Sequence, residues 1–176
     1  MFKIFGVIMI IFSTTYIGFL KASTYKNRIL ELTEFQKGFE LFETEVRFTK
    51  SPLCTAFLNI SKNLSGNVSL IFKQFSEEYL DTNGESASEI WDKVIDNNIK
   101  NLNLVSNDLS IIKDFGICLG TFDEEGQLES VSSIIKRLSY IKIVSQYYAR
   151  KIQNCIKALV YIQGYLYRYY YFNNGG

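Results

Sequence analysis

The chain opens with a run of apolar positions. Residues 4–20 hold 17 positions without a charge, and a helix of that length spans roughly 26 Å at about 1.5 Å per residue, close to the hydrocarbon core of a bilayer. We therefore predict a membrane anchor over residues 1–24. A cleaved signal peptide is the alternative, but Lys21 stands where small residues should prepare a cleavage site.

Apolar side chains then recur every three or four positions across residues 25–48, which predicts one amphipathic helix. They form an early seam that consists of Leu32, Phe35, Phe39, Phe42 and Val46. The opposite face carries Glu31, Glu34, Lys37, Glu40 and Glu45. We expect this face to be solvated, and the alternative is an acidic patch that binds a basic partner.

Residues 49–52 are predicted to end this helix and to start another. Ser51 suits an N-cap, and Pro52 suits the first helical position because the N–H that proline lacks would be unsatisfied there anyway. A second helix is therefore expected from Pro52 to about Asn63.

Shorter helices are predicted in the middle of the chain. One is expected over residues 68–80. Ser86 and Glu89 form a capping box ahead of the next, which carries the single tryptophan, Trp91, as an expected core anchor. The helix after that is expected to end at Gly120, in the position beyond a helix that glycine favours.

The longest predicted helix begins near Glu124, which forms a second capping box with Thr121. Beyond Ile141 it carries a late seam with heptad spacing. The late seam consists of Tyr148, Ile152, Cys155, Leu159, Ile162 and Leu166. A seam of this kind needs a partner helix, and we expect the early seam to be that partner.

These elements predict an all-α fold, a helical bundle with long antiparallel helices, preceded by an N-terminal transmembrane helix. We divide the chain into the anchor over residues 1–24, a helical bundle over residues 25–157 and a tyrosine-rich tail over residues 158–176. No alternating pattern of useful length predicts a strand.

Charges on either side of the anchor favour a bundle in the cytoplasm. Only Lys3 precedes the apolar run, whereas Lys21, Lys26 and Arg28 follow it. Positive residues concentrate on the cytoplasmic side of a membrane helix, so this asymmetry sets the expected orientation.

Composition argues against an enzyme and against nucleic-acid binding. The chain has no histidine, which removes the usual proton carrier and the commonest metal ligand, so no cofactor or metal is expected. Its 19 basic and 18 acidic residues nearly cancel, so the chain lacks the excess of positive charge that binds the phosphates of nucleic acid. The widely spaced Cys54, Cys118 and Cys155 form no metal or disulfide motif, and we expect three small, buried, reduced residues.

Two motifs carry a resemblance to a known family. The pattern L-x-x-E-[IV]-x-[YF]-x-x-T-P-L stands at residues 42–53, with Phe42 for the first leucine and Ser51 for the threonine. The pattern F-G-x-x-L-G-x-x-D-x-x-x-Q stands at Phe115, Gly116, Leu119, Gly120, Asp123 and Gln127. Weaker matches are Thr14, Thr15, Gly18 and Phe19 near the end of the anchor, and Glu89 to Trp91 in mid-chain. On these residues, the chain resembles the stage III sporulation protein AB family of endospore-forming bacteria.

The resemblance implies a component of the channel between mother cell and forespore. Family members resemble the helical cytosolic domains of type II secretion platform proteins. The implied place is the outer forespore membrane, with the bundle facing the mother-cell cytoplasm. The implied partners are membrane lipid and other stage III sporulation channel proteins, including a mother-cell ATPase, and a homo-oligomer stays open.

One region departs from the family pattern. Family members end in a second apolar membrane helix, whereas here only ten uncharged residues run from Ala158 to Tyr167. About 20 residues are needed to cross a bilayer. The tail is therefore expected either to lie at the membrane interface or to be a degenerate second span.

The candidate structural or interface positions are Glu45, Ser51, Pro52, Phe115, Gly116, Gly120, Asp123 and Gln127. Most have a structural explanation, since the glycines suit close packing and a helix stop, and Asp123 suits a helix cap. Glu45 should pair with Lys136 or Arg137 if buried, and is an interface candidate if exposed. The function that the resemblance implies is a non-enzymatic scaffold or adaptor of the channel, between a cytosolic ATPase and membrane subunits. The alternative is a secreted helical binding protein whose signal peptide is cleaved.

Overall fold

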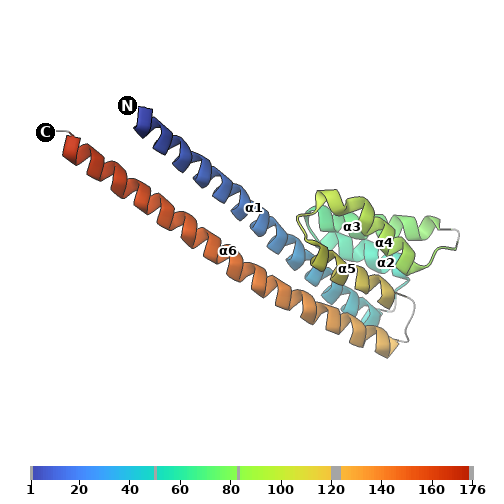
Figure 1. Cartoon of the computed structure of the whole chain (residues 1–176). Coiled ribbons are helices and arrows are strands. Elements are labelled where there is room, and N and C mark those ends of the chain that lie inside the picture. Colours follow the sequence, from blue (N-terminus) through green and yellow to red (C-terminus); the bar gives the residue numbers. More distant parts are fainter. Residues whose placement is uncertain (1, 50, 83, 120–123, 175–176) are drawn as a thin grey trace. The chain divides into compact units, whose positions relative to one another are not determined.

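The structure of the chain is a computed structural model. It describes residues 2–49, 51–82, 84–119 and 124–174, apart from some side chains near the two ends of the chain. The helices are α1 (Phe2–Thr44), α2 (Leu53–Asn63), α3 (Gly66–Asp81), α4 (Ala87–Asn98), α5 (Ser106–Cys118) and α6 (Glu124–Asn174) (Figure 1). A π-helical turn (Glu45–Thr49) follows α1, and a 3₁₀ turn (Ile99–Asn101) follows α4. The predicted all-α class is confirmed, with no strand among the described residues.

The chain forms two compact units. The terminal unit comprises residues 1–26 and 144–176, and the central unit comprises Asn27–Ile143. Helices α1 and α6 contribute to both, and their segments run antiparallel within each unit (Figure 1). The long antiparallel helices expected from the sequence are therefore present. The functional division into anchor, bundle and tail stays a prediction.

The core of the central unit is a cluster of aromatic rings from α1 to α5. Its fully buried aromatic members are Phe35, Phe39, Phe42, Phe57, Phe72, Phe75, Trp91 and Phe115. Phe39 of α1 stacks on Phe115 of α5 with ring centroids 4.0 Å apart. The indole N–H of Trp91 donates to the carbonyl of Ile112 at 2.8 Å, so this buried ring leaves its polar atom satisfied. The prediction of Trp91 as a core anchor is confirmed.

The early seam is buried, but not against the late seam. Its side chains from Leu32 to Phe42 share one core with α2 to α5 and with the first part of α6. Four described members of the late seam are exposed instead, namely Tyr148 50%, Leu159 49%, Ile162 57% and Cys155, whereas Ile152 is partly buried. The predicted pairing of the two seams is wrong, because the core that buries the early seam is built by α2 to α5 and by residues 131–141 of α6, ahead of the late seam.

Cysteine burial also differs from the expectation. Cys118 is buried, but Cys54 is only partly buried and Cys155 is exposed, so the prediction of three buried cysteines is wrong for two of them. Cys155 lies on the late seam between Leu159 and Tyr148, which are also exposed.

Helix starts agree with the sequence in one case and differ in another. At α4 the capping box is confirmed, since the Glu89 N–H donates to the Ser86 hydroxyl at 3.2 Å and the Ser86 N–H donates to Glu89 at 2.8 Å. At α2 the N-cap is Pro52, with ψ 141° and no side-chain cap. Ser51 therefore lies one position too early to cap, which corrects the predicted roles of both residues.

Gly116 allows α5 to approach α4 closely, as predicted. A Cβ atom at this position would lie 2.7 Å from Cδ1 of Trp91, closer than real Cβ contacts. Gly38 of α1 plays the same part against the ring of Phe72, at 2.6 Å. The predicted helix stop at Gly120 and the capping residue Thr121 lie outside the described residues.

The charged face of α1 is used within the molecule. Glu31 accepts hydrogen bonds from the backbone and side-chain N–H groups of Asn103 at 2.7 and 2.9 Å, and Glu34 accepts from the Ser65 N–H at 2.7 Å. Lys37 donates to the carbonyl of Asn63. These side chains fasten α1 to the connections between the other helices. Glu31, Glu34 and Lys37 are therefore not a freely solvated face, whereas Glu40 is exposed.

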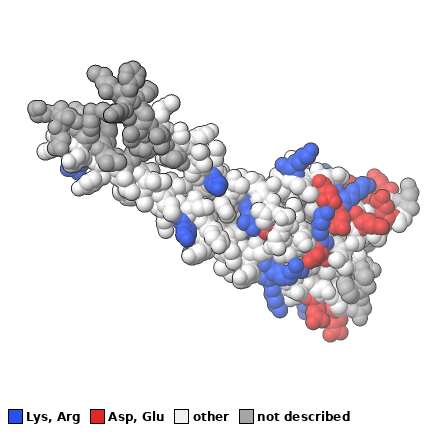
Figure 2. Space-filling view, in the orientation of Figure 1, with Lys and Arg blue, Asp and Glu red and all other residues white. Residues whose placement is uncertain are grey.

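Charge divides between the two units. The terminal unit contains seven lysines and arginines and no acidic residue, whereas the central unit contains the other 12 basic and all 18 acidic residues. In Figure 2 the acidic side chains lie at the right of the view with basic side chains among them, and isolated basic side chains stand among uncharged ones elsewhere.

No helix with described side chains is long and apolar enough to cross a bilayer. Most side chains of residues 4–20 lie outside those that the structure describes, although their backbone is helical. The predicted N-terminal anchor therefore stays a prediction.

Candidate interaction site

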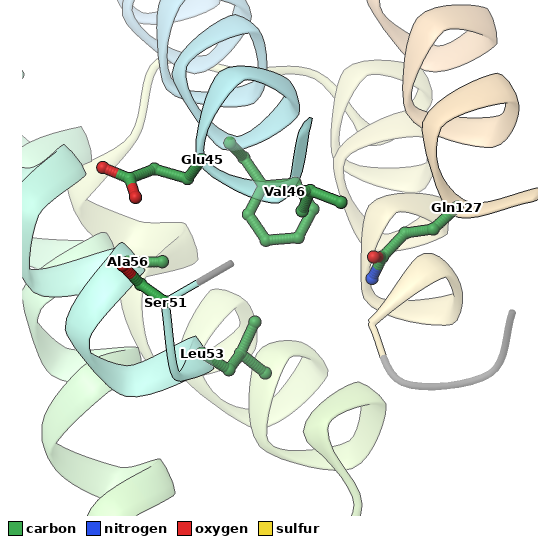
Figure 3. Close-up of a pocket in the computed structure, with 7 residues that line it drawn as sticks. Glu45, Val46, Ser51, Leu53, Ala56 and Gln127 are labelled. Carbon is green, nitrogen blue, oxygen red and sulfur yellow. The ribbon is translucent and has the colours of Figure 1, made fainter. Parts of the chain in front are cut away.

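A hollow of about 310 Å³ opens in the central unit where α1 ends and α2 and α6 begin (Figure 3). Its lining residues are Phe42, Glu45, Val46, Ser51, Leu53, Ala56 and Gln127. The volume is at the lower end of the range for ligand pockets and suits one or two side chains of a partner.

The hollow unites the two family motifs. All of its lining residues except Gln127 come from the first motif or follow it closely, and Gln127 ends the second motif. Gln127 donates from Nε2 to the carbonyl of Cys118 at 2.9 Å, which ties the start of α6 to the last turn of α5. Segments about 75 positions apart in the sequence thus form one surface feature.

The π-helical turn Glu45–Thr49 shapes one wall of the hollow. A π-helical turn places an extra residue in a helix and is frequent at functional sites. Here it places Glu45 and Val46 on the lining, while Phe48 in the same turn is 76% exposed. Arg47 is held back along the helix by Glu43 at 3.0 Å. The turn therefore offers a carboxylate and two apolar side chains close together.

Glu45 contributes to the hollow a carboxylate oxygen that lacks a partner among the described residues. Its Oε2 atom is buried and has no hydrogen-bond partner among the described residues. The expected pairing with Lys136 or Arg137 is wrong, because Arg137 binds Asp114 at 2.6 Å and Lys136 is exposed. A buried acceptor without a donor is unfavourable, so a donor from outside would stabilise this site.

The other candidate residues are distributed around this feature. Phe115 and Gly116 lie in the core, so they support the fold and do not form an interface. Pro52 starts α2 at the edge of the hollow. Gly120 and Asp123 lie outside the described residues. The structure therefore brings Glu45, Ser51 and Gln127 together at the hollow. Phe115 and Gly116 of the second motif are buried in the core instead.

The lining suits binding better than chemistry. Its polar groups are one carboxylate, one hydroxyl and one amide, set among apolar side chains. Burial raises the pKa of the nearby Cys118 thiol, an effect that a hydrogen bond with Ser130 partly offsets, so the reactive thiolate is disfavoured. Among the described residues, no group of three or more acidic or cysteine side chains could hold a metal ion.

Sequence reasoning missed the apolar part of this site. Val46 was assigned to the early seam, and Leu53 and Ala56 to the second helix, without a shared surface. The available signal was the first motif itself, since it runs without a gap through the end of one helix and the start of the next.

Sequence and fold comparisons point to the same relatives. The family model described as "Stage III sporulation protein AB" matches residues 3–167. Stage III sporulation protein AB of Bacillus subtilis (strain 168) is 28% identical over 166 residues, which cover 94% of this chain and 96% of that protein. A solved structure of a stage III sporulation protein AB has a similar fold, with a TM-score of 0.66 at 24% identity, covering 70% of this chain and 97% of that one.

Proposed function

Because this chain belongs to the stage III sporulation protein AB family, we propose that it is a non-enzymatic adaptor of the channel between mother cell and forespore. Family membership confirms the resemblance drawn from the motifs and links the chain to sporulation. In this proposal the terminal unit attaches to the outer forespore membrane. The central unit faces the mother-cell cytoplasm and joins a mother-cell ATPase to membrane subunits.

The hollow beside Glu45 is the observation that carries the proposal. Its unpartnered carboxylate oxygen favours a cationic donor, and its apolar lining favours an uncharged neighbour of that donor. A partner loop with an arginine or lysine next to an apolar residue satisfies both. Arginine fits better than lysine, because its planar fork can donate two hydrogen bonds to one carboxylate.

An adaptor role agrees with the chemistry of the chain. Histidine, the side chain most used for proton transfer near neutral pH, is absent from the sequence. The central unit has 18 acidic against 12 basic residues, so its field attracts a basic partner surface. Phe48, exposed in the same π-helical turn as Glu45, provides an apolar contact of the type enriched at interfaces.

Binding of the sporulation ATPase to the full chain in nanodiscs tests this proposal. Glu45→Gln keeps the size of the side chain and removes its charge, and we expect it to weaken binding about tenfold. Glu77→Gln is the matched variant, because Glu77 is an exposed α3 carboxylate that pairs only along its own helix with Lys73 at 3.4 Å. It should bind as the unchanged chain does.

Two results would contradict the proposal in different ways. If the folded Glu45→Gln chain binds as tightly as the Glu77→Gln chain, the hollow is not the contact. If the unchanged chain fails to bind the ATPase at low salt, the link to the motor is wrong.

A further inference from the structure

The terminal unit carries five exposed basic side chains within a short length of its two helices, near the point where these helices contact each other. We define this basic collar as Lys21, Lys26, Arg150, Lys151 and Lys157, all of them exposed. The two helices contact each other at Gly18 and Ile156, because a Cβ atom at Gly18 would lie 3.2 Å from Cγ1 of Ile156. We use this contact as the reference level along the helix axes. The residues of the collar belong to α1 and α6, which run antiparallel here (Figure 1).

Helix geometry keeps the collar compact. At about 1.5 Å per residue, Lys21 and Lys157 lie within roughly 5 Å of this level along the helix axes. Arg150 and Lys151 lie about 8 to 9 Å from it, and Lys26 about 12 Å, all in the same direction because the helices are antiparallel. Five positive charges therefore share a short length of the terminal unit.

Nothing within the terminal unit neutralises these charges. The unit contains no aspartate or glutamate, so its net charge is positive by seven at pH 7. No ion pair among the described residues involves a member of the collar, whereas lysines of the central unit pair with neighbouring carboxylates, such as Lys113 with Asp96 at 2.7 Å. The collar is therefore available to an external anion.

Between the collar and the two ends of the chain, the exposed surface is apolar and aromatic. Its exposed side chains include Tyr16, Ile17, Leu20, Tyr161 and Tyr165, each at least 50% exposed. Tyrosine beside lysine and arginine is the composition that sits at the boundary between acyl chains and headgroups. Nucleic acid would not favour the neighbouring isoleucine and leucine, whereas a bilayer would.

We infer that the basic collar binds the headgroups of anionic phospholipids, so that the terminal unit attaches preferentially to negatively charged membrane. This inference rests on the proposed membrane attachment and adds its lipid preference. The apolar side chains provide attachment to any bilayer, and the collar adds an electrostatic term that only anionic lipid supplies. That term should weaken with salt, because exposed charges are screened.

Flotation of the full chain with vesicles separates these two contributions. One vesicle is pure phosphatidylcholine, and the other contains about 30 mol% phosphatidylglycerol, enough to give a negative surface potential. We expect binding to both, with affinity about tenfold or more higher for the anionic vesicle at low salt. Replacing all five collar residues by glutamine should remove this preference and leave binding to phosphatidylcholine unchanged.

A second fivefold variant controls for net charge. It replaces Lys62, Lys73, Lys93, Lys100 and Lys136 by glutamine, five exposed lysines of the central unit. It removes as much positive charge as the collar variant does. It should keep the preference for anionic vesicles, and circular dichroism checks that both variants are folded.

The other possible outcomes separate the lipid preference of the collar from membrane attachment itself. Equal binding of the unchanged chain to the two vesicles overturns the collar and leaves membrane attachment standing. No binding to either vesicle overturns membrane attachment, and the collar with it. Equal loss of preference in both fivefold variants shows a net-charge effect only. Binding of short duplex DNA that is lost in the collar variant alone, without a lipid preference, makes the collar a nucleic-acid surface instead.

Discussion

Arg28 of α1 and Asp108 of α5 form a double charge-assisted contact across 80 positions of sequence. Arg28 Nε lies 2.7 Å from Asp108 Oδ2, and Nη2 lies 2.9 Å from Oδ1. The Asp108 side chain is fully buried and that of Arg28 is 16% exposed. Asp108 also accepts the Val105 N–H at 3.1 Å, so the same carboxylate caps the start of α5.

This pair changes the role predicted for Arg28. The arginine was counted among the charges that orient the anchor, but the structure places it in a buried contact of the central unit. Lys21 and Lys26 remain as the exposed charges after the apolar run. The inferred orientation therefore depends on a smaller excess of positive charge.

Breaking the pair should destabilise the central unit. Arg28→Gln leaves the buried Asp108 carboxylate without its cation, so we expect the free energy of unfolding to fall by about 3 kcal/mol. Chemical denaturation followed by circular dichroism measures the change. Lys73→Gln breaks an exposed pair with Glu77 and should change stability by less than about 0.5 kcal/mol. Equal stability of the two variants would show that the buried pair adds nothing.

A methyl group at Gly116 should also destabilise the fold. Gly116→Ala places a Cβ atom 2.7 Å from the Trp91 ring, and overpacking of this kind costs about 1–3 kcal/mol. Gly164→Ala is the comparison, because nothing lies within 4 Å of a Cβ atom there. Alanine favours a helix over glycine by about 1 kcal/mol, so the second variant should melt at a higher temperature than the unchanged chain. A rise in melting temperature for both variants would refute the close approach at Gly116.

The three cysteines should react in the order of their exposure. A maleimide at pH 8 should label the exposed Cys155 first, the partly buried Cys54 more slowly, and the buried Cys118 only when the chain unfolds. Mass spectrometry of labelled peptides over time gives the order. Labelling of Cys118 as fast as Cys155 in the folded chain would contradict its burial.

The Cys118 thiol should also make stability depend on pH. Burial raises its pKa above the ordinary value of 9.0, so the unfolded chain loses this proton at lower pH than the folded chain does. Its contribution to stability is therefore complete below that value and is lost as pH rises through the raised pKa. Comparing denaturation from pH 8 to 10 in the unchanged chain and in Cys118→Ala isolates this slope. Identical slopes would show that the thiol does not contribute.

The N-terminus separates the membrane adaptor from the secreted alternative. We expect mass spectrometry of the chain isolated from sporulating cells to find the segment from Met1 to Leu20 intact. Lys21→Ala provides small residues at the places that signal peptidase reads, so this variant should be cleaved more readily. Loss of the segment from the unchanged chain would favour the secreted binding protein.

Much of the fold followed from local patterns in the sequence. The helical periodicity, the capping box of Ser86 and Glu89, and the burial of Trp91 were all predicted, because each depends on residues within a few positions of one another. For the site, the motifs identified Glu45, Ser51 and Gln127. They did not predict that these three residues line one hollow, since their meeting depends on how α1, α2 and α6 pack.

Only the tertiary structure decided which residues pair across long distances. An apolar seam at positions 32–46 requires burial but does not specify its partner, and the structure buries it among α2 to α5 and the first part of α6. Likewise, a charged residue such as Arg28 or Glu31 reads as solvated until the fold brings Asp108 or Asn103 beside it. Periodicity and caps are short-range properties that the sequence determines, whereas the choice of partner depends on the packing of the whole unit, which no local pattern contains.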